Sequence, residues 1–485
     1  MTAPTAAPDL LRSILGNTAS LVAGRLLVTG LRFVVALMIV RTAGLERFGE
    51  FALISSFILI ADWLTDFGLA DIAAREMATR HERNNATFSA FTVLKAIQGP
   101  VAALAMAVAL PLLDHPPGIV RAGFMATGAV LLYAGVQVFR LEFRHTMRMA
   151  RDVAAELVAA LVLLMAVWYA VRREASVEML TLCLVFSRAC QFAMAACLSA
   201  RRTRLEFGPA FRSDFRILLT ASVPLGLTGL VVGAYDAVDA VALARWSTHD
   251  EVGAFSIVLR MVMLAIIAIQ ALAMVTLPLL SSLWTRDREL FTRTLQCVMD
   301  WGMLIAGTLL CGLYAGAGAL SSMTAREPAA ISAVLQLMVW AILARTVVTL
   351  VSPLVIIAGR LQRTIWIATL VLTAKVLALY FTAQAGAVGA AAAYLIAEVG
   401  VGLVPTVILC QQAASVRLNW SVPLKLTMLA TVLAFGVDAL PLPEPLRGLL
   451  APTLFLTLAT SLRIVRLRPL RELVELIHRR RGTNG

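Results

Sequence analysis

The sequence of 485 residues contains few charged side chains. Only 15% of its residues are Asp, Glu, Lys or Arg, whereas 60% are hydrophobic, and the mean hydropathy is +0.85. Soluble globular chains average about 25% charged and about 45–50% apolar residues. A soluble protein of this length would need a polar surface that this chain lacks. We therefore expect a polytopic membrane protein, without a nucleotide-hydrolysing module or a large periplasmic catalytic domain.

Cysteine and histidine are also scarce. The six Cys form no CxxC pair, and the five His have no metal-ligand spacing with one another. No GxSxG, HExxH, P-loop or DxD motif occurs in a suitable context. The sequence therefore predicts no disulfide framework, no metal site, no cofactor and no catalytic residue.

Apolar stretches of the length that crosses a bilayer, about 20 residues, recur along the chain. They predict an all-α protein with about fourteen transmembrane helices. The expected spans are 18–39, 48–67, 88–112, 121–139, 153–171, 178–199, 216–243, 253–281, 292–318, 329–358, 364–382, 385–409, 422–441 and 446–463. The residues before position 18 lack the basic start, short apolar core and cleavage site of a signal peptide.

Positive charge is distributed unevenly between the predicted loops. Most of the 42 Lys and Arg residues fall in the N-terminus, in the loops after even-numbered spans and in the C-terminus. Because cytoplasmic segments are enriched in Lys and Arg, both termini are predicted to be cytoplasmic. The net charge of +13 thus reflects topology, and no nucleic-acid partner is expected. The tail at 464–485 predicts either an amphipathic helix on anionic lipid or a frayed basic end.

Two short motifs recur about 202–204 residues apart. The pairs are Thr18-Ala19-Ser20 with Thr220-Ala221-Ser222, and Phe48-Gly49-Glu50-Phe51-Ala52 with Val252-Gly253-Ala254-Phe255-Ser256. Because the offset spans six helices, both halves enter the membrane in the same direction, as in transporters with parallel repeats. The predicted organisation is an N-terminal cytoplasmic segment (1–17), an N-lobe (18–200), a linker (201–215), a C-lobe (216–410), two additional spans (411–463) and the tail (464–485).

Several motifs resemble one family of membrane proteins. They are Asn17-Thr18-Ala19-Ser20, Arg41-Thr42-Ala43-Gly44-Leu45-Glu46-Arg47-Phe48-Gly49-Glu50-Phe51-Ala52, Asp66-Phe67-Gly68-Leu69, Pro353 with Ala358-Gly359-Arg360, and Gly386-Ala387-Val388-Gly389-Ala390-Ala391-Ala392 with Glu398. The chain resembles bacterial polysaccharide-biosynthesis flippases of the O-antigen type, in the multidrug/oligosaccharidyl-lipid/polysaccharide exporter superfamily, over nearly its whole length.

The resemblance implies two six-helix lobes around a central cavity that opens alternately to the cytoplasm and the periplasm. Spans 1, 2, 7 and 8 would line that cavity, and the headgroup of a polyprenyl-pyrophosphate-linked oligosaccharide would pass through it while the polyprenyl tail stays in lipid. The family context also implies a bacterial inner-membrane location, and a polysaccharide polymerase and glycosyltransferases as partners. Drug-exporting relatives usually have twelve spans, whereas peptidoglycan-precursor flippases also have fourteen.

Charged residues inside the predicted spans are the functional candidates, because an unpaired charge within a bilayer is costly. The embedded cations are Arg25, Arg32, Lys95, Arg188, Arg260, Arg345 and Lys375, and the embedded acids are Asp62, Asp236, Asp239, Asp300 and Glu398. The pairs expected from matching depth on neighbouring spans are Arg25 with Asp62, Arg260 with Asp236, and Lys375 with Glu398.

Three embedded arginines have no acid at matching depth on an adjacent span: Arg32, Arg188 and Arg345. A guanidinium binds two phosphate oxygens at once. Arg32 is therefore the first candidate for a pyrophosphate contact, followed by Arg25, Arg345 and Arg260. Arg188 lies on a span that the family picture places away from the central helices, so we expect a structural role for it.

Embedded acids are the candidates for ion coupling, and they are Asp236, Asp239, Asp62 and Glu398. Asp236 and Asp239, three residues apart, share one side of their span. They would hold and release a proton, ligate sodium, or act as counter-ions of Arg260.

The function expected from the sequence is translocation of a lipid-linked oligosaccharide from the cytoplasmic to the periplasmic leaflet by alternating access. A cation-coupled multidrug exporter of the same superfamily is the alternative. A membrane glycosyl polymerase or ligase is the rival from another class. Such an enzyme would carry a long periplasmic loop, whereas every predicted outer loop is short.

Overall fold

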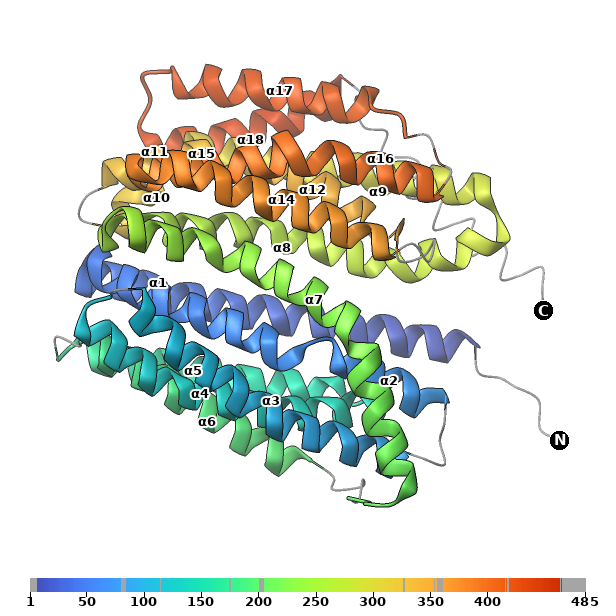
Figure 1. Cartoon of the computed structure of the whole chain (residues 1–485). Helices are drawn as coiled ribbons and strands as arrows, with labels where there is room; N and C mark the ends of the chain where they lie inside the picture. The colour runs from blue at the N-terminus through green and yellow to red at the C-terminus, as the bar shows by residue number, and fades with distance from the viewer. Residues whose placement is uncertain are drawn as a thin grey trace. The chain divides into compact units, whose positions relative to one another are not determined.

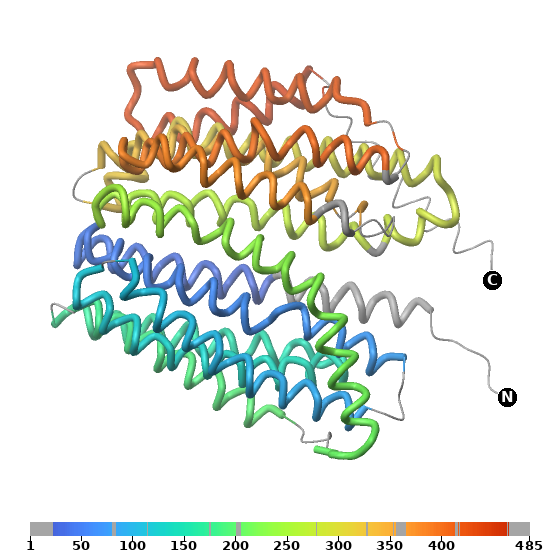
Figure 2. Tube along the Cα trace, viewed as in Figure 1, coloured from blue at the N-terminus to red at the C-terminus, as the bar shows by residue number. Residues whose placement is uncertain are grey.

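A computed structural model of the chain (Figures 1 and 2) describes residues 7–79, 84–113, 115–173, 176–199, 205–325, 328–352, 354–355, 361–414, 416, 418–462 and 464. Within these ranges the side chains at 7–22, 278, 361–364 and 413–414 are not described. Most of the basic tail, and the motifs at Pro353 and Ala358-Gly359-Arg360, lie outside the described residues.

The described residues form helices and no strand, which confirms the all-α fold class. The helices of the first half are α1 (Ala7–Asp66), α2 (Leu69–Thr79), α3 (Asn84–Leu112), α4 (Pro117–His145), α5 (Met149–Val171), α6 (Val177–Leu198), α7 (Pro209–Trp246) and α8 (His249–Arg286). The second half contains α9 (Arg288–Ala315), α10 (Ala317–Thr324), α11 (Pro328–Met338), α12 (Ala341–Val351), α14 (Leu361–Thr382), η2 (Ala383–Ala385), α15 (Gly386–Leu395), η3 (Ile396–Gly402), α16 (Leu403–Ala414), α17 (Ser421–Asp438) and α18 (Glu444–Ser461).

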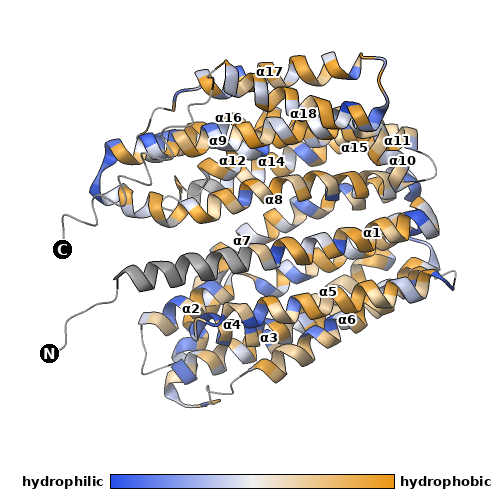
Figure 3. Cartoon of the chain, turned by 180° about the vertical axis from the view of Figure 1, so that it is seen from behind, coloured by the Kyte–Doolittle hydropathy of each residue, from blue (hydrophilic) through white to orange (hydrophobic). Residues whose placement is uncertain are grey.

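Within the described residues, ten helical stretches are long and apolar enough to cross a membrane, or eleven if the bent pair α11 and α12 forms one span. Two of these stretches, Ala23–Thr79 and Ile365–Gln412, each cover two of the spans expected from the sequence. Large apolar side chains such as Leu104, Trp168 and Phe186 are exposed, and apolar residues run along the helices (Figure 3). These are the properties of a multi-pass membrane protein; the count of fourteen stays a prediction.

The chain divides into two compact units. The first comprises residues 1–257 and 379–387, and the second comprises 258–378 and 388–485. In the first unit, α3, α4, α5 and α6 pack side by side, and α1 contacts α3, α4, α5 and α7 (Figure 1). In the second unit, α9 packs against α12, α17 and α18. The six-plus-six lobe boundaries drawn from the sequence stay a prediction.

Two breaks shape the N-terminal helices of the first unit. Gly44 has a φ of 89°, so the chain kinks between the two spans expected at 18–39 and 48–67. Phe67 and Gly68, with φ of 42° and 67°, separate α1 from α2. The ammonium group of Lys95, whose side chain is buried, donates to the carbonyl oxygens of Thr65 and Asp66 at the end of α1. This buried cation therefore donates hydrogen bonds to backbone carbonyls at the end of the helix, where carbonyl groups have no partner within the helix.

A close crossing of two helices joins the copies of the repeated motif in the first unit. A Cβ atom on Gly49 would lie 1.8 Å from the carbonyl oxygen of His249, and one on Gly253 would lie 2.2 Å from that of Leu45. Gly49 thus faces the carbonyl of the residue four positions before Gly253, and Gly253 faces the carbonyl of the residue four positions before Gly49. This reciprocity is expected where two copies of a motif cross about a local two-fold axis, and it supports the internal repeat.

The start of α8 also holds the start of α15 in the first unit. The Glu251 carboxylate accepts a 2.6 Å hydrogen bond from the backbone N–H of Ala387. Gly386, with a φ of 72°, lies so close to this carboxylate that a Cβ there would be 2.7 Å from it. A carboxylate at a helix N-terminus is favoured by the helix dipole. The glycine-rich motif beginning at Gly386 is thereby anchored.

Candidate functional site

A polar cavity of about 270 Å³ lies within the first unit. Its walls come from α1, α4, α5 and α6, which are apolar helices that meet at this point. The lining residues are Arg32, Leu59, Asp62, Trp63, Asp66, Tyr133, Glu156, Arg188 and Gln191. Five of the nine carry a formal charge, in a chain with only 15% charged residues. Because charge inside an apolar helix layer marks function more often than packing, this cavity is the candidate site.

An ion pair between α1 and α6 forms one wall of the cavity. Arg188 Nη2 donates to Asp62 Oδ2 at 2.7 Å, and its guanidinium lies 4.4 Å from the ring centroid of Tyr133. The prediction that Arg188 has no acid at matching depth on an adjacent span is therefore wrong, because Asp62 on α1 is that acid. The pair joins residues 126 positions apart, so only the packing of α6 near α1 reveals it.

The expected pairing of Arg25 with Asp62 is also wrong. The Asp62 carboxylate is bound by Arg188, and no carboxylate among the described residues lies within 4.0 Å of Arg25. Arg25 is exposed on α1 and does not line the cavity. Its assignment as a substrate contact stays a prediction.

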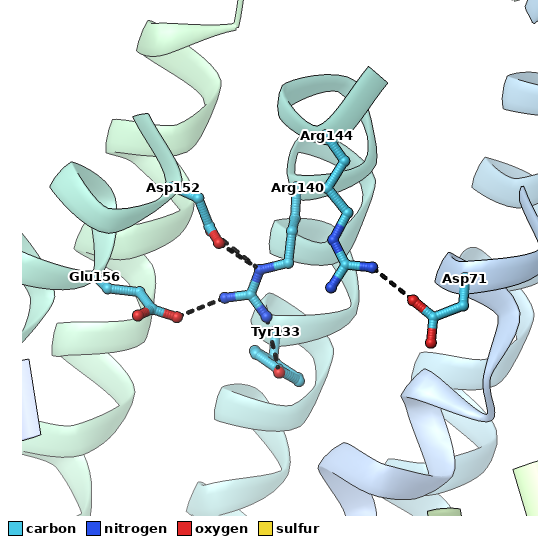
Figure 4. Close-up of polar contacts among 6 residues, drawn as sticks. All are labelled: Asp71, Tyr133, Arg140, Arg144, Asp152 and Glu156. Atoms are coloured by element: carbon cyan, nitrogen blue, oxygen red, sulfur yellow. Dashed lines mark hydrogen bonds and ion pairs between the residues drawn. The ribbon is translucent and has the colours of Figure 1, made fainter. Parts of the chain in front are cut away.

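Arg140 organises the adjoining wall, as Figure 4 shows. Its Nε donates to both oxygens of Asp152, at 3.0 and 2.9 Å, and its Nη2 donates to Glu156 Oε1 at 2.6 Å. Its Nη1 also lies 3.3 Å from the hydroxyl of Tyr133. A guanidinium with this many partners fixes Glu156 and Tyr133, both of which line the cavity. From the sequence, Arg140 was interpreted only as a cytoplasmic charge, and Glu156 was not among the candidates. The signal that could have identified them is the four-residue spacing of Asp152 and Glu156, which places both carboxylates on one face of a helix.

Arg32 differs from the other cationic residues of this region. It lines the cavity and is exposed, and no carboxylate of the described chain lies within 4.0 Å of it. Arg188 and Arg140 are committed to Asp62, Asp152 and Glu156. The guanidinium of Arg32 is thus the cavity cation that is available to a ligand.

In the second unit, Arg345 is ion-paired. Its Nη1 donates to Glu398 Oε1 at 2.6 Å, and both side chains are largely buried. The prediction that Arg345 has no acid at matching depth is therefore wrong, and Glu398, in the π-helical segment η3, is its partner. The Lys375 ammonium group lies 4.9 Å from the Tyr394 ring centroid. The pairing of Lys375 with Glu398 stays a prediction.

The other candidate acids lie on α7. Asp236 is exposed, whereas Asp239 is buried, so the two carboxylates occupy different environments although they are three residues apart. The pairing of Asp236 with Arg260 stays a prediction. Among the residues with described positions, no group of three or more His, Cys, Asp or Glu is arranged to hold a metal ion.

Comparison with known proteins gives one family and one fold. The family model described as "Polysaccharide biosynthesis protein" matches residues 14–284, more than half of the chain. No curated protein matches the sequence.

Solved structures share the fold of most of the chain at low sequence identity. The chain is similar to a lipid II flippase MurJ in an inward closed conformation, with a TM-score of 0.73 and 11% identity, over 91% of this chain and 99% of that one. It is also similar to a multidrug resistance MATE family transporter of the MOP superfamily in an inward-facing conformation, with a TM-score of 0.66 and 12% identity, over 80% and 96% of the two chains. A MOP superfamily transporter from Pyrococcus furiosus gives a TM-score of 0.60 at 13% identity, over 83% and 95%.

Proposed function

The chain belongs to the polysaccharide biosynthesis protein family, and from this premise we propose that it is a flippase for a polyprenyl-pyrophosphate-linked oligosaccharide. It would move the headgroup from the cytoplasmic to the periplasmic leaflet of the bacterial inner membrane by alternating access, for surface polysaccharide synthesis. Both termini would be cytoplasmic. The proposed activity is transport, and no residue is assigned a catalytic role.

One observation carries this proposal: Arg32 presents an available guanidinium to a polar cavity inside an apolar helix layer. A guanidinium offers planar paired donors that match two oxygens of a phosphate. A pyrophosphate linking a sugar to a polyprenyl chain has the charge and the geometry that Arg32 binds.

Arg32→Ala is expected to reduce transport about 30-fold, since loss of a hydrogen-bonded contact to a charged group costs about 2 kcal/mol. Arg32→Lys keeps the charge but not the paired donors, so an intermediate reduction of about fivefold is expected. The measurement is flipping of a fluorescent short-chain polyprenyl-pyrophosphate oligosaccharide in proteoliposomes.

Arg41→Ala is the matched control for this experiment. Arg41 is an exposed arginine of the same helix and does not line the cavity, so its removal is expected to leave the flipping rate unchanged. Full activity of both Arg32 variants would remove Arg32 from the site.

A cation-coupled multidrug exporter is the second candidate, because the chain shares its fold with MATE transporters. Deletion of the gene is expected to trap lipid-linked oligosaccharide on the cytoplasmic leaflet, and overexpression is expected to leave drug resistance unchanged. Leaflet distribution of the lipid-linked oligosaccharide and a resistance profile measure these outcomes. Unchanged surface polysaccharide together with raised resistance would favour the exporter.

The candidate residues for coupling transport to an ion are Asp62, Asp236, Asp239 and Glu398. Two of these acids, Asp62 and Glu398, are held by arginines at 2.7 and 2.6 Å. Protonation of either carboxylate would weaken its ion pair and release a guanidinium. Asp62 is the acid that lines the cavity, so coupling at Asp62 would reach the proposed substrate site directly.

A further inference from the structure

Two acceptor atoms in the cavity wall have no partner within the described part of the chain. They are Oδ1 of Asp62 and Oε1 of Gln191, on α1 and α6. Gln191 is only 2% exposed and Asp62 is 9% exposed. A buried acceptor without a donor is destabilising and rare in folded proteins. Two such acceptors in one cavity indicate that a ligand supplies the donors.

The position of the Asp62 carboxylate is fixed by its other oxygen. Oδ2 is bound by Arg188 at 2.7 Å, and the Arg188 guanidinium is in turn stacked near Tyr133. Oδ1 is therefore held in place by an ion pair that already balances its charge. Such a pre-positioned acceptor binds with little loss of conformational freedom.

The charges of the cavity select the kind of donor. Arg188 lies close enough to Asp62 to disfavour a metal ion or an ammonium group beside it. The carboxylates of Asp62, Asp66 and Glu156 disfavour a phosphate in contact with Asp62, which leaves Arg32 as the phosphate contact of the cavity. Neutral donors remain, and these are the hydroxyl and amide N–H groups that a sugar carries. At about 270 Å³, the cavity is at the lower limit of ligand pockets, about 300 Å³, so it fits a sugar unit and not a whole oligosaccharide.

We propose that Asp62 and Gln191 form a subsite for the sugar attached directly to the pyrophosphate. This inference rests on the proposed flippase function and deepens it. Arg32 takes the pyrophosphate, and the Asp62 and Gln191 acceptors take donors of the neighbouring sugar. The cavity thus recognises both the pyrophosphate and the sugar bonded to it. A polyprenyl pyrophosphate without a sugar is therefore bound less tightly than the glycosylated form.

The test compares two kinds of probe on the full-length protein in nanodiscs. One is farnesyl pyrophosphate, and the others are the same compound carrying one glucose, one galactose or one N-acetylglucosamine. In the wild-type protein at least one sugar is expected to lower the Kd about tenfold relative to farnesyl pyrophosphate. Gln191→Met is expected to reduce this gain about fivefold, as for loss of one hydrogen bond, and to leave the Kd of farnesyl pyrophosphate unchanged.

Gln137→Met is the matched control. Gln137 on α4 is also buried, at 3% exposed, with an unpartnered Oε1 among the described residues, but it does not line the cavity. Its replacement is expected to keep the whole gain from the sugar. If Gln191→Met does not yield folded protein, Gln191→Asn withdraws the amide from the cavity by one methylene and is expected to lower the gain in the same way.

Two outcomes overturn the proposal: no sugar improves binding to the wild-type protein, or the gain survives both in Gln191→Met and in the double variant Asp62→Leu with Arg188→Met, which has no acceptor at position 62. Failure of the flippase proposal has a separate readout. If Arg32→Ala leaves the Kd of farnesyl pyrophosphate unchanged, the pyrophosphate contact is wrong, whereas the gain from the sugar still reports on Asp62 and Gln191.

Discussion

Gly49→Ala is expected to lower the stability of the folded protein by about 3 kcal/mol. The new Cβ would lie 1.8 Å from the His249 carbonyl oxygen and 2.9 Å from the Gly253 nitrogen. Both are backbone atoms, so no side chain can rotate away, and the two helices must separate. Gly253→Ala is expected to have the same effect, because its Cβ would meet the Leu45 carbonyl oxygen at 2.2 Å. The measurement is the Tm of the detergent-purified variants.

Gly30→Ala is the matched control for the glycine crossing. Gly30 lies on the same helix, α1, and a Cβ atom there would meet nothing within 4 Å. Alanine has a higher helix propensity than glycine by about 1 kcal/mol, so Gly30→Ala is expected to keep or raise the Tm. A Gly49→Ala variant as stable as Gly30→Ala would show that the helices do not cross as closely as described.

Arg188→Met is expected to destabilise the protein by about 3–4 kcal/mol. The substitution leaves the Asp62 carboxylate buried and without its ion-pair partner, and removal of one member of a buried pair costs this much. The double variant Asp62→Leu with Arg188→Met removes both charges. It is expected to recover to within about 1 kcal/mol of the wild-type protein, because apolar replacement of a buried pair is often neutral.

Arg121→Met is the control for this double-mutant cycle. Arg121 forms a 3.1 Å pair with Glu178 in the same unit, but its side chain is 69% exposed. An exposed pair contributes about 0–1 kcal/mol, so only a small change is expected. Unfolding of the wild-type protein, the two single variants and the double variant in mixed micelles gives the free energies. Losses that simply add in the double variant would mean that Arg188 and Asp62 do not interact.

Several conclusions drawn from the sequence agree with the structure. The apolar stretches predicted a multi-pass all-α protein, and the motifs around Gly49 and Asp66 identified the family, which the family model confirms over residues 14–284. Low charge and long apolar runs are local properties of the chain, so composition and periodicity reveal them without knowledge of the packing.

The partners of three embedded charges, Asp62, Arg188 and Arg345, were predicted wrongly from the sequence. Depth along a span gives the height of a residue in the membrane, but it does not tell which neighbouring helix its side chain faces. Asp62 therefore appeared to suit Arg25, whereas it binds Arg188, 126 positions away on α6. Arg345 appeared to have no partner, whereas it binds Glu398, 53 positions away in η3.

The sequence by itself determined the class of protein, the repeated glycine motif, the family, and Arg32 as the first candidate cation. Tertiary structure alone decided that Arg32 is the available guanidinium of a cavity whose other cation, Arg188, is bound to Asp62. It also decided that Gln191, which has no charge to draw notice in a sequence, belongs to the same cavity. The reason is physical. Hydropathy and charge are properties of single residues and can be determined from the sequence, whereas the cavity forms only where the faces of α1, α4, α5 and α6 pack together.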